Sequence, residues 1–187
     1  MNDTRNSQTP YFLSANHCIS TQEAASTLTT YWFFRAESCN SSPKFDEAAR
    51  RYSGGATLRF THAPTDATLL QLNSGVPANV VYAGSYYGSQ VGSGSGVIGV
   101  HNPAGDLQKY SVGTVSGYSN CTLRNDGTID CSAANVSNGN MFKVTWRRGV
   151  TEGGSSGSAI FTEANGGKRY VVGNLMGGGS SCQNPSA

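Results

Sequence analysis

The chain is organised around one stretch, Thr151-Glu152-Gly153-Gly154-Ser155-Ser156-Gly157-Ser158-Ala159-Ile160-Phe161, in which a glycine-rich polar turn runs directly into an apolar strand. Glycine lets the backbone bend sharply at such a turn. A turn of this kind can hold one serine hydroxyl clear of the surface while two backbone N–H groups converge beside it, which is the geometry of an acyl-transfer nucleophile. Ser156 is therefore a candidate nucleophile. Gly/Ser runs are also typical of loops and linkers, so the assignment needs a base and an orienting group.

Both groups have candidates upstream of this turn. His17 follows an apolar strand-like run that begins at Tyr11, and it stands next to Cys18. Asp66 stands at the start of another apolar strand, where the side chains that follow can anchor it in a core. Because His17 and Asp66 lie in the first half of the chain and Ser156 in the second, we expect the site to lie between two subdomains. The alternatives are a structural histidine and an aspartate that caps a strand.

Composition limits the class of protein. A chain of 187 residues with 37% hydrophobic residues can bury one domain or two small barrels. Its apolar runs are far shorter than the roughly 20 residues of a membrane-spanning helix. With 13% charged residues, 24 glycines and a net charge of +2, it is typical of a turn-rich all-β protein without a basic surface for nucleic acid.

Short strand-like stretches follow one another along the chain, separated by Gly, Asn, Ser or Pro, which favours barrels or a sandwich over alternating βα units. They are residues 10–15, 27–34, 57–61, 68–72, 80–83, 96–101, 109–115, 142–147, 159–162 and 169–175. Short helical turns are predicted at 22–28 and 46–51. The segment Gly75–Asn79 is the natural linker, which predicts a first barrel over residues 1–75 and a second over 80–187.

Five cysteines in a short, loop-rich chain indicate disulfides and an oxidising compartment. Cys121 and Cys131 bracket Asn125-Asp126-Gly127, a strong turn signal, so we expect them to join one hairpin. No second ligand with metal spacing accompanies His62 or His101, and we expect both to be structural. We predict neither a metal nor another cofactor.

The motifs resemble a known family when they are taken together. Residues 13–18, 66–70 and 154–158 are similar to the three catalytic motifs of chymotrypsin-fold serine endopeptidases, in the family order. The closest resemblance is to the secreted bacterial lysyl endopeptidase branch. Further segments that resemble this branch are Tyr31-Trp32, Val100-His101-Asn102-Pro103, Lys109-Tyr110-Ser111, Val144-Thr145-Trp146 and Gly177-Gly178-Gly179-Ser180-Ser181-Cys182.

The resemblance implies an all-β fold of two antiparallel Greek-key β-barrels and a Ser-His-Asp triad of Ser156, His17 and Asp66. It implies an oxyanion hole made by the backbone N–H groups of Gly154 and Ser156. It also implies a Cys18–Cys39 disulfide, which leaves Cys182 unpaired. Extended substrates would pair with a strand edge formed by Leu175, Met176, Gly177 and Gly178. We therefore expect a secreted, monomeric endopeptidase that acts on proteins or peptides and binds neither nucleic acid nor membrane.

The positions that would set specificity differ from those of trypsin and of the lysyl branch. The position six residues before Ser156, where trypsin carries an acidic pocket residue, is Val150, and Met176 stands where the lysyl branch carries a histidine near a tryptophan that matches Trp146. The acidic pocket residue of that branch would lie beyond Ala187. The histidine motif comes early in the sequence, at His17, and the sequence ends at Ala187. We therefore expect a fragment in which both barrels are incomplete. Two other classes stay open, a catalytically silent protease-fold binding module and a carbohydrate-binding β-sandwich.

Overall fold

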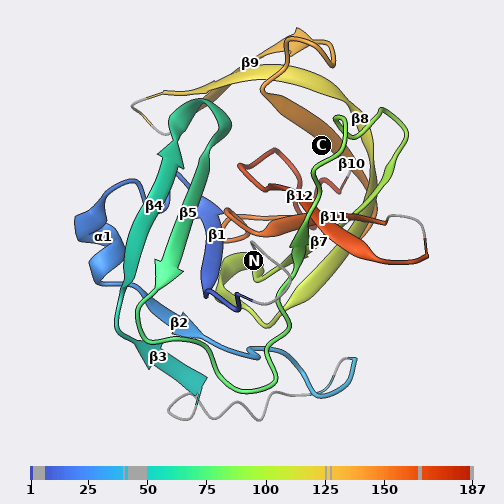
Figure 1. The fold of residues 1–187 in the computed structure, drawn as a ribbon. Coiled ribbons are helices and arrows are strands. Elements are labelled where there is room, and N and C mark those ends of the chain that lie inside the picture. The colour runs from blue at the N-terminus through green and yellow to red at the C-terminus, as the bar shows by residue number, and fades with distance from the viewer. Residues whose placement is uncertain are drawn as a thin grey trace.

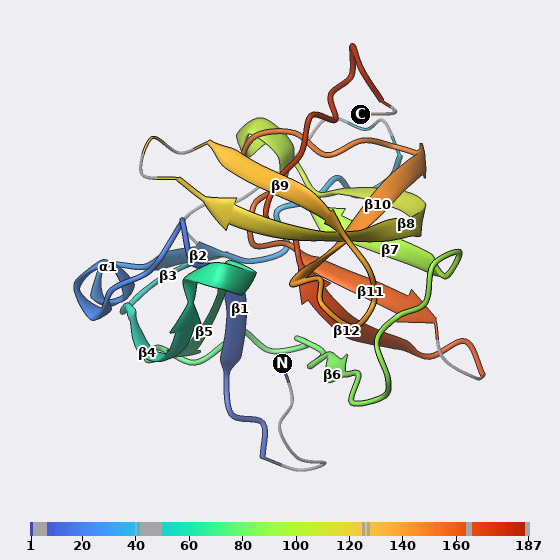
Figure 2. The ribbon, with the colours of Figure 1, turned by 90° about the horizontal axis from the view of Figure 1, so that it is seen from above.

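Strands and connecting loops make up most of this protein. The structure is a computed structural model that describes residues 1, 7–39, 41, 50–124, 126, 128–163 and 166–185. Figures 1 and 2 show β1, β4, β5 and α1 on one side of the molecule and β7 to β12 on the other. The first group is called the N-terminal half below, and the second the C-terminal half. Within the described ranges, no helix is long and apolar enough to cross a membrane.

The N-terminal half contains an antiparallel sheet with strand order β1-β5-β4 and a separate β2-β3 pair. Its elements are β1 (Tyr11–Ala15), α1 (Gln22–Ser26), β2 (Thr29–Tyr31), β3 (Arg51–Ser53), β4 (Ala56–His62), the 3-10 turn η1 (Ala63–Thr65) and β5 (Ala67–Leu72). Alternate residues of β5 are buried, as expected for a strand with one face on a core. Leu70 and Leu72 from this face pack with Ala25 of α1 and Ala56 of β4.

The C-terminal half is built on a second sheet, with strand order β10-β8-β7-β11-β12-β6 and with β9 paired to β8. Its elements are β6 (Gly84–Ser85), β7 (Gly96–His101), the 3-10 turn η2 (Pro103–Gly105), β8 (Lys109–Leu123), β9 (Ile129–Ala134), β10 (Met141–Arg148), β11 (Ala159–Glu163) and β12 (Arg169–Asn174). Val97, Val115, Trp146 and Ile160 form its core. Each half thus has a core of its own, while the predicted boundary at residues 75–80 stays a prediction.

The all-β fold class is confirmed, and several element predictions are corrected. Residues 80–83 form no strand, because Val81 is 90% exposed and finds no partner, and the short β6 follows instead. The strand predicted over 27–34 is limited to β2, since Phe33 adopts a left-handed backbone (φ 56°) that ends it. β8 continues to Leu123, beyond the predicted end at 115. Of the helical turn predicted at 46–51, Arg51 begins β3 and residues 46–49 lie outside the described residues.

The cysteines follow the sequence predictions only in part. Cys121 and Cys131 are directly opposite each other on β8 and β9 and form a disulfide. Cys18, Cys39 and Cys182 are free and exposed, so the Cys18–Cys39 bridge that the resemblance implies is not formed. The segment before Cys39 is tied to the C-terminal half, since the Phe34 carbonyl accepts a hydrogen bond from the backbone N–H of Gln108 (2.9 Å). Cys18 instead lies in the turn after β1, where its N–H donates to the Ala15 carbonyl (3.2 Å).

Removing the β8–β9 disulfide should destabilise the protein measurably. We expect the double variant Cys121→Ser/Cys131→Ser to lose about 2–3 kcal/mol in the free energy of unfolding, because the bridge closes a short loop in the unfolded chain. Urea unfolding under non-reducing conditions measures this difference. Cys182→Ser, which changes a free exposed thiol, is the matched control and should stay within about 0.5 kcal/mol of wild type. Equal stability of the double variant and this control would contradict the prediction.

Candidate active site

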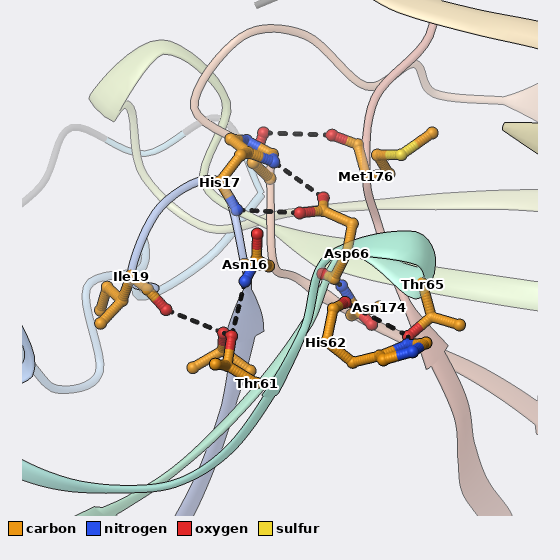
Figure 3. Close-up of polar contacts among 11 residues, drawn as sticks. Asn16, His17, Ile19, Thr61, His62, Thr65, Asp66, Asn174 and Met176 are labelled. Carbon is orange, nitrogen blue, oxygen red and sulfur yellow. Dashed lines mark hydrogen bonds and ion pairs between the residues drawn. The ribbon is translucent and has the colours of Figure 1, made fainter. Parts of the chain in front are cut away.

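The end of β1 and the start of β5 bring a histidine and an aspartate together. Ala15 and Ala67 are register partners, so the residues just outside these ends are neighbours. The Nδ1 atom of His17 lies 2.7 Å from Oδ2 of Asp66, and the His17 backbone N–H donates to Oδ1 at 2.9 Å (Figure 3). The carboxylate oxygens therefore hold both the ring and the main chain of His17. In a neutral ring whose Nδ1–H donates to Asp66, the other nitrogen is a proton acceptor.

The Asp66 side chain is completely buried, and its backbone is held from both halves of the molecule. Its φ and ψ of 46° and 36° are left-handed, a conformation that aspartate tolerates better than most residues. The Asp66 carbonyl accepts hydrogen bonds from the Asn16 backbone N–H (3.0 Å) and from Nδ2 of Asn174 on β12 (2.8 Å). Asn140 Nδ2 donates to the carbonyl of Pro64 in the same turn (2.6 Å). This turn is therefore fixed against the C-terminal half.

A chain of side-chain hydrogen bonds supports the His17 segment from the N-terminal sheet. Asn16 Nδ2 donates to Thr61 Oγ1 (2.6 Å), the two threonine hydroxyls of Thr61 and Thr68 are 2.8 Å apart, and Thr68 Oγ1 donates to the Ile19 carbonyl (2.8 Å) (Figure 3). Sequence reasoning missed these groups and the two asparagines of the C-terminal half. Thr68 carried a usable signal, since it is a polar residue on the buried face of an otherwise apolar strand.

The Gly/Ser turn reaches the same place from the C-terminal half. Gly157 has a left-handed backbone, and a Cβ there would lie 2.6 Å from the Ala15 nitrogen and 2.9 Å from Ser14 Oγ. Only glycine permits this approach. The Gly157 N–H also donates to the Leu175 carbonyl (2.7 Å), which fixes the turn to the chain after β12. Ser156, the preceding residue, is therefore held against the end of β1, close in sequence to His17.

The turn leaves alternate backbone N–H groups without partners. The N–H of Ser155 donates to the Glu152 carbonyl (3.0 Å), and that of Gly157 is used as described. The N–H groups of Gly154 and Ser156 make no hydrogen bond to any group in the part of the chain that the structure describes. Gly154 is exposed and has a φ of 86°. Two backbone donors, one on either side of Ser155, are thus available to an acceptor outside the described residues.

The Ser156 hydroxyl is partly buried and donates to the Met176 carbonyl (3.4 Å). The Ser156 hydroxyl thus donates to a main-chain oxygen and not to the His17 ring. Catalytic hydrogen bonds are often long or differently paired before substrate binds, and one rotation about the Cα–Cβ bond redirects this hydroxyl.

The predicted substrate edge divides into two parts. Leu175 uses both main-chain groups inside the protein, since its N–H donates to the Ser158 carbonyl (2.9 Å) and its carbonyl accepts from Gly157. Gly177 and Gly178 are exposed, and their main-chain groups bond to no other described residue. This edge borders a cavity of about 1040 Å³, which is lined mostly by the C-terminal half, with Phe142, Trp146, Met176 and Ser180 among its residues, and also by Thr65 and Ala67 of the N-terminal half.

The other candidates for a nucleophile or a metal ligand are not part of the group formed by His17, Asp66 and Ser156. Although Cys18 is exposed as a whole residue, partial burial of its thiol and then the Asp66 charge raise the pKa of Cys18, which keeps this thiol protonated at neutral pH. His62 is exposed and its Nδ1 lies 2.9 Å from Thr65 Oγ1 (Figure 3). His101 is buried between two serine hydroxyls. Over the described ranges, no group of three or more His, Cys, Asp or Glu side chains is placed to hold a metal ion.

Known proteins resemble this chain in sequence and in fold. Residues 1–187 match the family described as lysyl endopeptidase, C-terminal domain. A lysyl endopeptidase of Pseudomonas aeruginosa is 34% identical over 188 residues, an alignment that covers 100% of this chain and 38% of that protein.

The solved structures extend the comparison to the fold. The MamO protease domain of Magnetospirillum magneticum aligns with a TM-score of 0.54 at 10% identity, covering 95% of this chain and 76% of that one. The murine norovirus NS6 protease aligns with a TM-score of 0.50 at 10% identity, covering 91% and 81%. At these identities the two structures bear on the fold alone, and they place it among protease folds.

Proposed function

Because this chain belongs to the lysyl endopeptidase C-terminal domain family, we propose that it cleaves peptide bonds as a serine endopeptidase, with Ser156 as nucleophile, His17 as general base and Asp66 as orienting carboxylate. The observation that carries the proposal is the buried Asp66 carboxylate, which holds both the ring and the backbone of His17 beside the Gly157 contact. The chain spans 38% of the length of its Pseudomonas relative.

The geometry supports a two-step acyl transfer. The Ser156 hydroxyl turns from the Met176 carbonyl and attacks the scissile carbonyl carbon, while its proton passes to the free ring nitrogen of His17. The N–H groups of Gly154 and Ser156 stabilise the oxyanion that forms. Collapse of this intermediate breaks the C–N bond, and the leaving amine takes the proton from His17. Water then repeats the sequence on the acyl-enzyme and releases the acid.

The substrate is proposed to be an extended protein or peptide chain, bound by a monomer along Met176–Gly178 and cleaved outside the cell. The Cys121–Cys131 disulfide supports an oxidising compartment. Among the described residues, the cavity lining includes one charged side chain, Lys143, and no carboxylate. A substrate lysine would find no acidic partner in this lining, so the proposal does not extend to the preference that the Pseudomonas relative's name indicates.

A silent protease-fold binding module is the second candidate. The bond from the Ser156 hydroxyl to Met176 favours it, because this bond occupies the proton that the base must remove. The carbohydrate-binding β-sandwich gains no support, since residues 1–187 match the lysyl endopeptidase C-terminal domain family.

Labelling with a fluorophosphonate probe separates the two candidates. We expect one covalent adduct on Ser156, located by peptide mass spectrometry, since the probe reacts with activated serines. Ser132→Ala, which removes an exposed hydroxyl on β9, should be labelled as wild type is. Absence of an adduct in a sample with a cooperative unfolding transition would support the silent module instead.

A further inference from the structure

A buried histidine lies behind the proposed oxyanion turn. His101, the last residue of β7, is 2% exposed, and its Nδ1 is 2.9 Å from Ser155 Oγ while its Nε2 is 3.1 Å from Ser111 Oγ. Both serines are completely buried. Ser155 is the residue between the two proposed oxyanion donors, and Ser111 belongs to the neighbouring strand β8. The imidazole therefore connects the turn to the sheet.

The hydrogen-bond partners determine which ring nitrogen carries the proton. Ser111 Oγ donates its single hydrogen to the Val150 carbonyl (2.9 Å), so it can only accept from His101, and Nε2 must carry the ring hydrogen. The Nδ1 of a neutral ring is then an acceptor for the Ser155 hydroxyl. Ser155 Oγ accepts in turn from the Glu152 backbone N–H (3.3 Å). The hydrogen bonds therefore form one series, from the Glu152 N–H through Ser155, His101 and Ser111 to the Val150 carbonyl, in which each group donates one hydrogen to the next.

The electrostatic surroundings agree with a neutral ring. Burial lowers the pKa of His101, and the Glu152 carboxylate opposes this shift. On β8, Lys109 is the register partner of His101, but it is half exposed and forms an ion pair with Asp106 (3.1 Å). A charged imidazolium would present a second N–H to Ser155, and the serine hydrogen would lose its buried acceptor.

This series of hydrogen bonds holds the turn at its start and again at Ser155. Val150 and Glu152 stand where the turn begins, and Ser155 stands at the proposed oxyanion donors. At Gly149, a Cβ would lie 2.7 Å from Ser111 Oγ, so the chain passes directly over this network. Between these points, the Gly153 carbonyl accepts from the Ala104 N–H (2.7 Å). The orientation of the peptide units on either side of Ser155 thus depends on the His101 contacts.

We propose that neutral His101, protonated on Nε2, is a positioning residue that acts through Ser155 to aim the N–H groups of Gly154 and Ser156 at the oxyanion of the acyl-transfer reaction. This role rests on the proposed serine endopeptidase function. Oxyanion stabilisation depends on donors that are oriented before the reaction begins. In this proposal, a histidine outside the triad provides that orientation. His101 contacts neither the substrate nor the reacting atoms, and its effect reaches them through the backbone of the turn.

Ser155→Ala is the sharpest variant, because it removes one oxygen and leaves the imidazole in place. We expect kcat and the rate of fluorophosphonate labelling to fall about tenfold with little change in KM, since misplaced donors weaken transition-state binding. The matched control is Ser119→Ala. Ser119 is a serine buried in the same sheet, 1% exposed, and its hydroxyl has no hydrogen-bond partner among the described residues. His101→Gln, which offers one donor and one acceptor without titrating, should retain activity that His101→Leu loses.

NMR of the full chain tests the arrangement without relying on activity. Nitrogen-15 spectra should show His101 in the Nε2–H form, and the amide signals of Gly154 and Ser156 should shift in His101→Leu far more than in His101→Gln. An Nδ1–H tautomer, equal Gly154 and Ser156 amide signals in the two histidine variants, or equal labelling rates in the two serine variants would overturn the proposal. If wild type is not labelled at all, the endopeptidase function fails, and the amide shifts still decide whether His101 positions the turn.

Discussion

Replacing Ser156 by alanine is expected to lower kcat for peptide hydrolysis by about 10⁴- to 10⁶-fold, because the hydroxyl that would form the acyl-enzyme is absent. His17→Ala should cause a loss of similar size, because this imidazole is the base to which the mechanism assigns the serine proton. KM should change little, because neither side chain is assigned a role in ground-state binding. Release of fluorescent fragments from a labelled protein substrate measures these rates without knowledge of the preferred residue.

The double variant provides the decisive comparison. If Ser156 and His17 act as one unit, the combined variant should be no less active than the poorer single variant. Losses that multiply would indicate two independent roles. Ser132→Ala is again the control for serine removal, with activity within about twofold of wild type. Residual hydrolysis at the wild-type rate in Ser156→Ala would show that another group performs the reaction.

The second large effect is expected at Asp66. We predict that Asp66→Asn reduces kcat by about 10⁴-fold, the magnitude that this change has in Ser-His-Asp triads of related fold. The geometry supplies the reason. One carboxylate oxygen accepts the His17 backbone N–H (2.9 Å) and the other faces Nδ1 (2.7 Å). The backbone hydrogen cannot move, so an asparagine must turn its oxygen toward the main chain and its NH₂ toward the ring.

The consequence is a change of tautomer. Facing an NH₂ group, Nδ1 of His17 becomes an acceptor, and the ring hydrogen moves to the nitrogen that should receive the serine proton. Nitrogen-15 NMR should show this change together with the loss of kcat. Asp130→Asn, which alters an exposed carboxylate paired with Arg124, is the matched control and should retain activity. Full activity of Asp66→Asn would remove Asp66 from the proposed mechanism.

Short-range patterns predicted much of the fold. The apolar runs of β5 and β11 and the pairing of Cys121 with Cys131 follow from local sequence, and each appears in the structure as expected. Strands without a local pattern were missed. β9 has almost entirely exposed residues, and its partner on β8 defines it. Conversely, residues 80–83 have β-branched and aromatic side chains but no neighbouring strand to pair with.

The contacts that bring the predicted site residues together are only partly visible in the sequence. The resemblance to family motifs identified His17, Asp66 and Ser156. The register of Ala15 with Ala67 explains why His17 and Asp66 are neighbours. The amide of Asn174 gave no signal, because its partner is a main-chain carbonyl far away in sequence. The implied Cys18–Cys39 pairing was wrong for a related reason, since the path of the chain before Cys39 depends on contacts with the other half.

The bonds from Asn174 to Asp66 and from Asn140 to Pro64 span 108 and 76 residues of sequence. A long loop must close before contacts of such high sequence separation contribute, so we expect these two bonds to form late in folding. The N-terminal half is made first during synthesis, yet its aspartate turn lacks these two supports until the second half has folded. Competence for catalysis should therefore be gained after most of the secondary structure has formed. In a refolding experiment, recovery of activity would mark the docking of the two halves, and a nascent chain would carry no active protease.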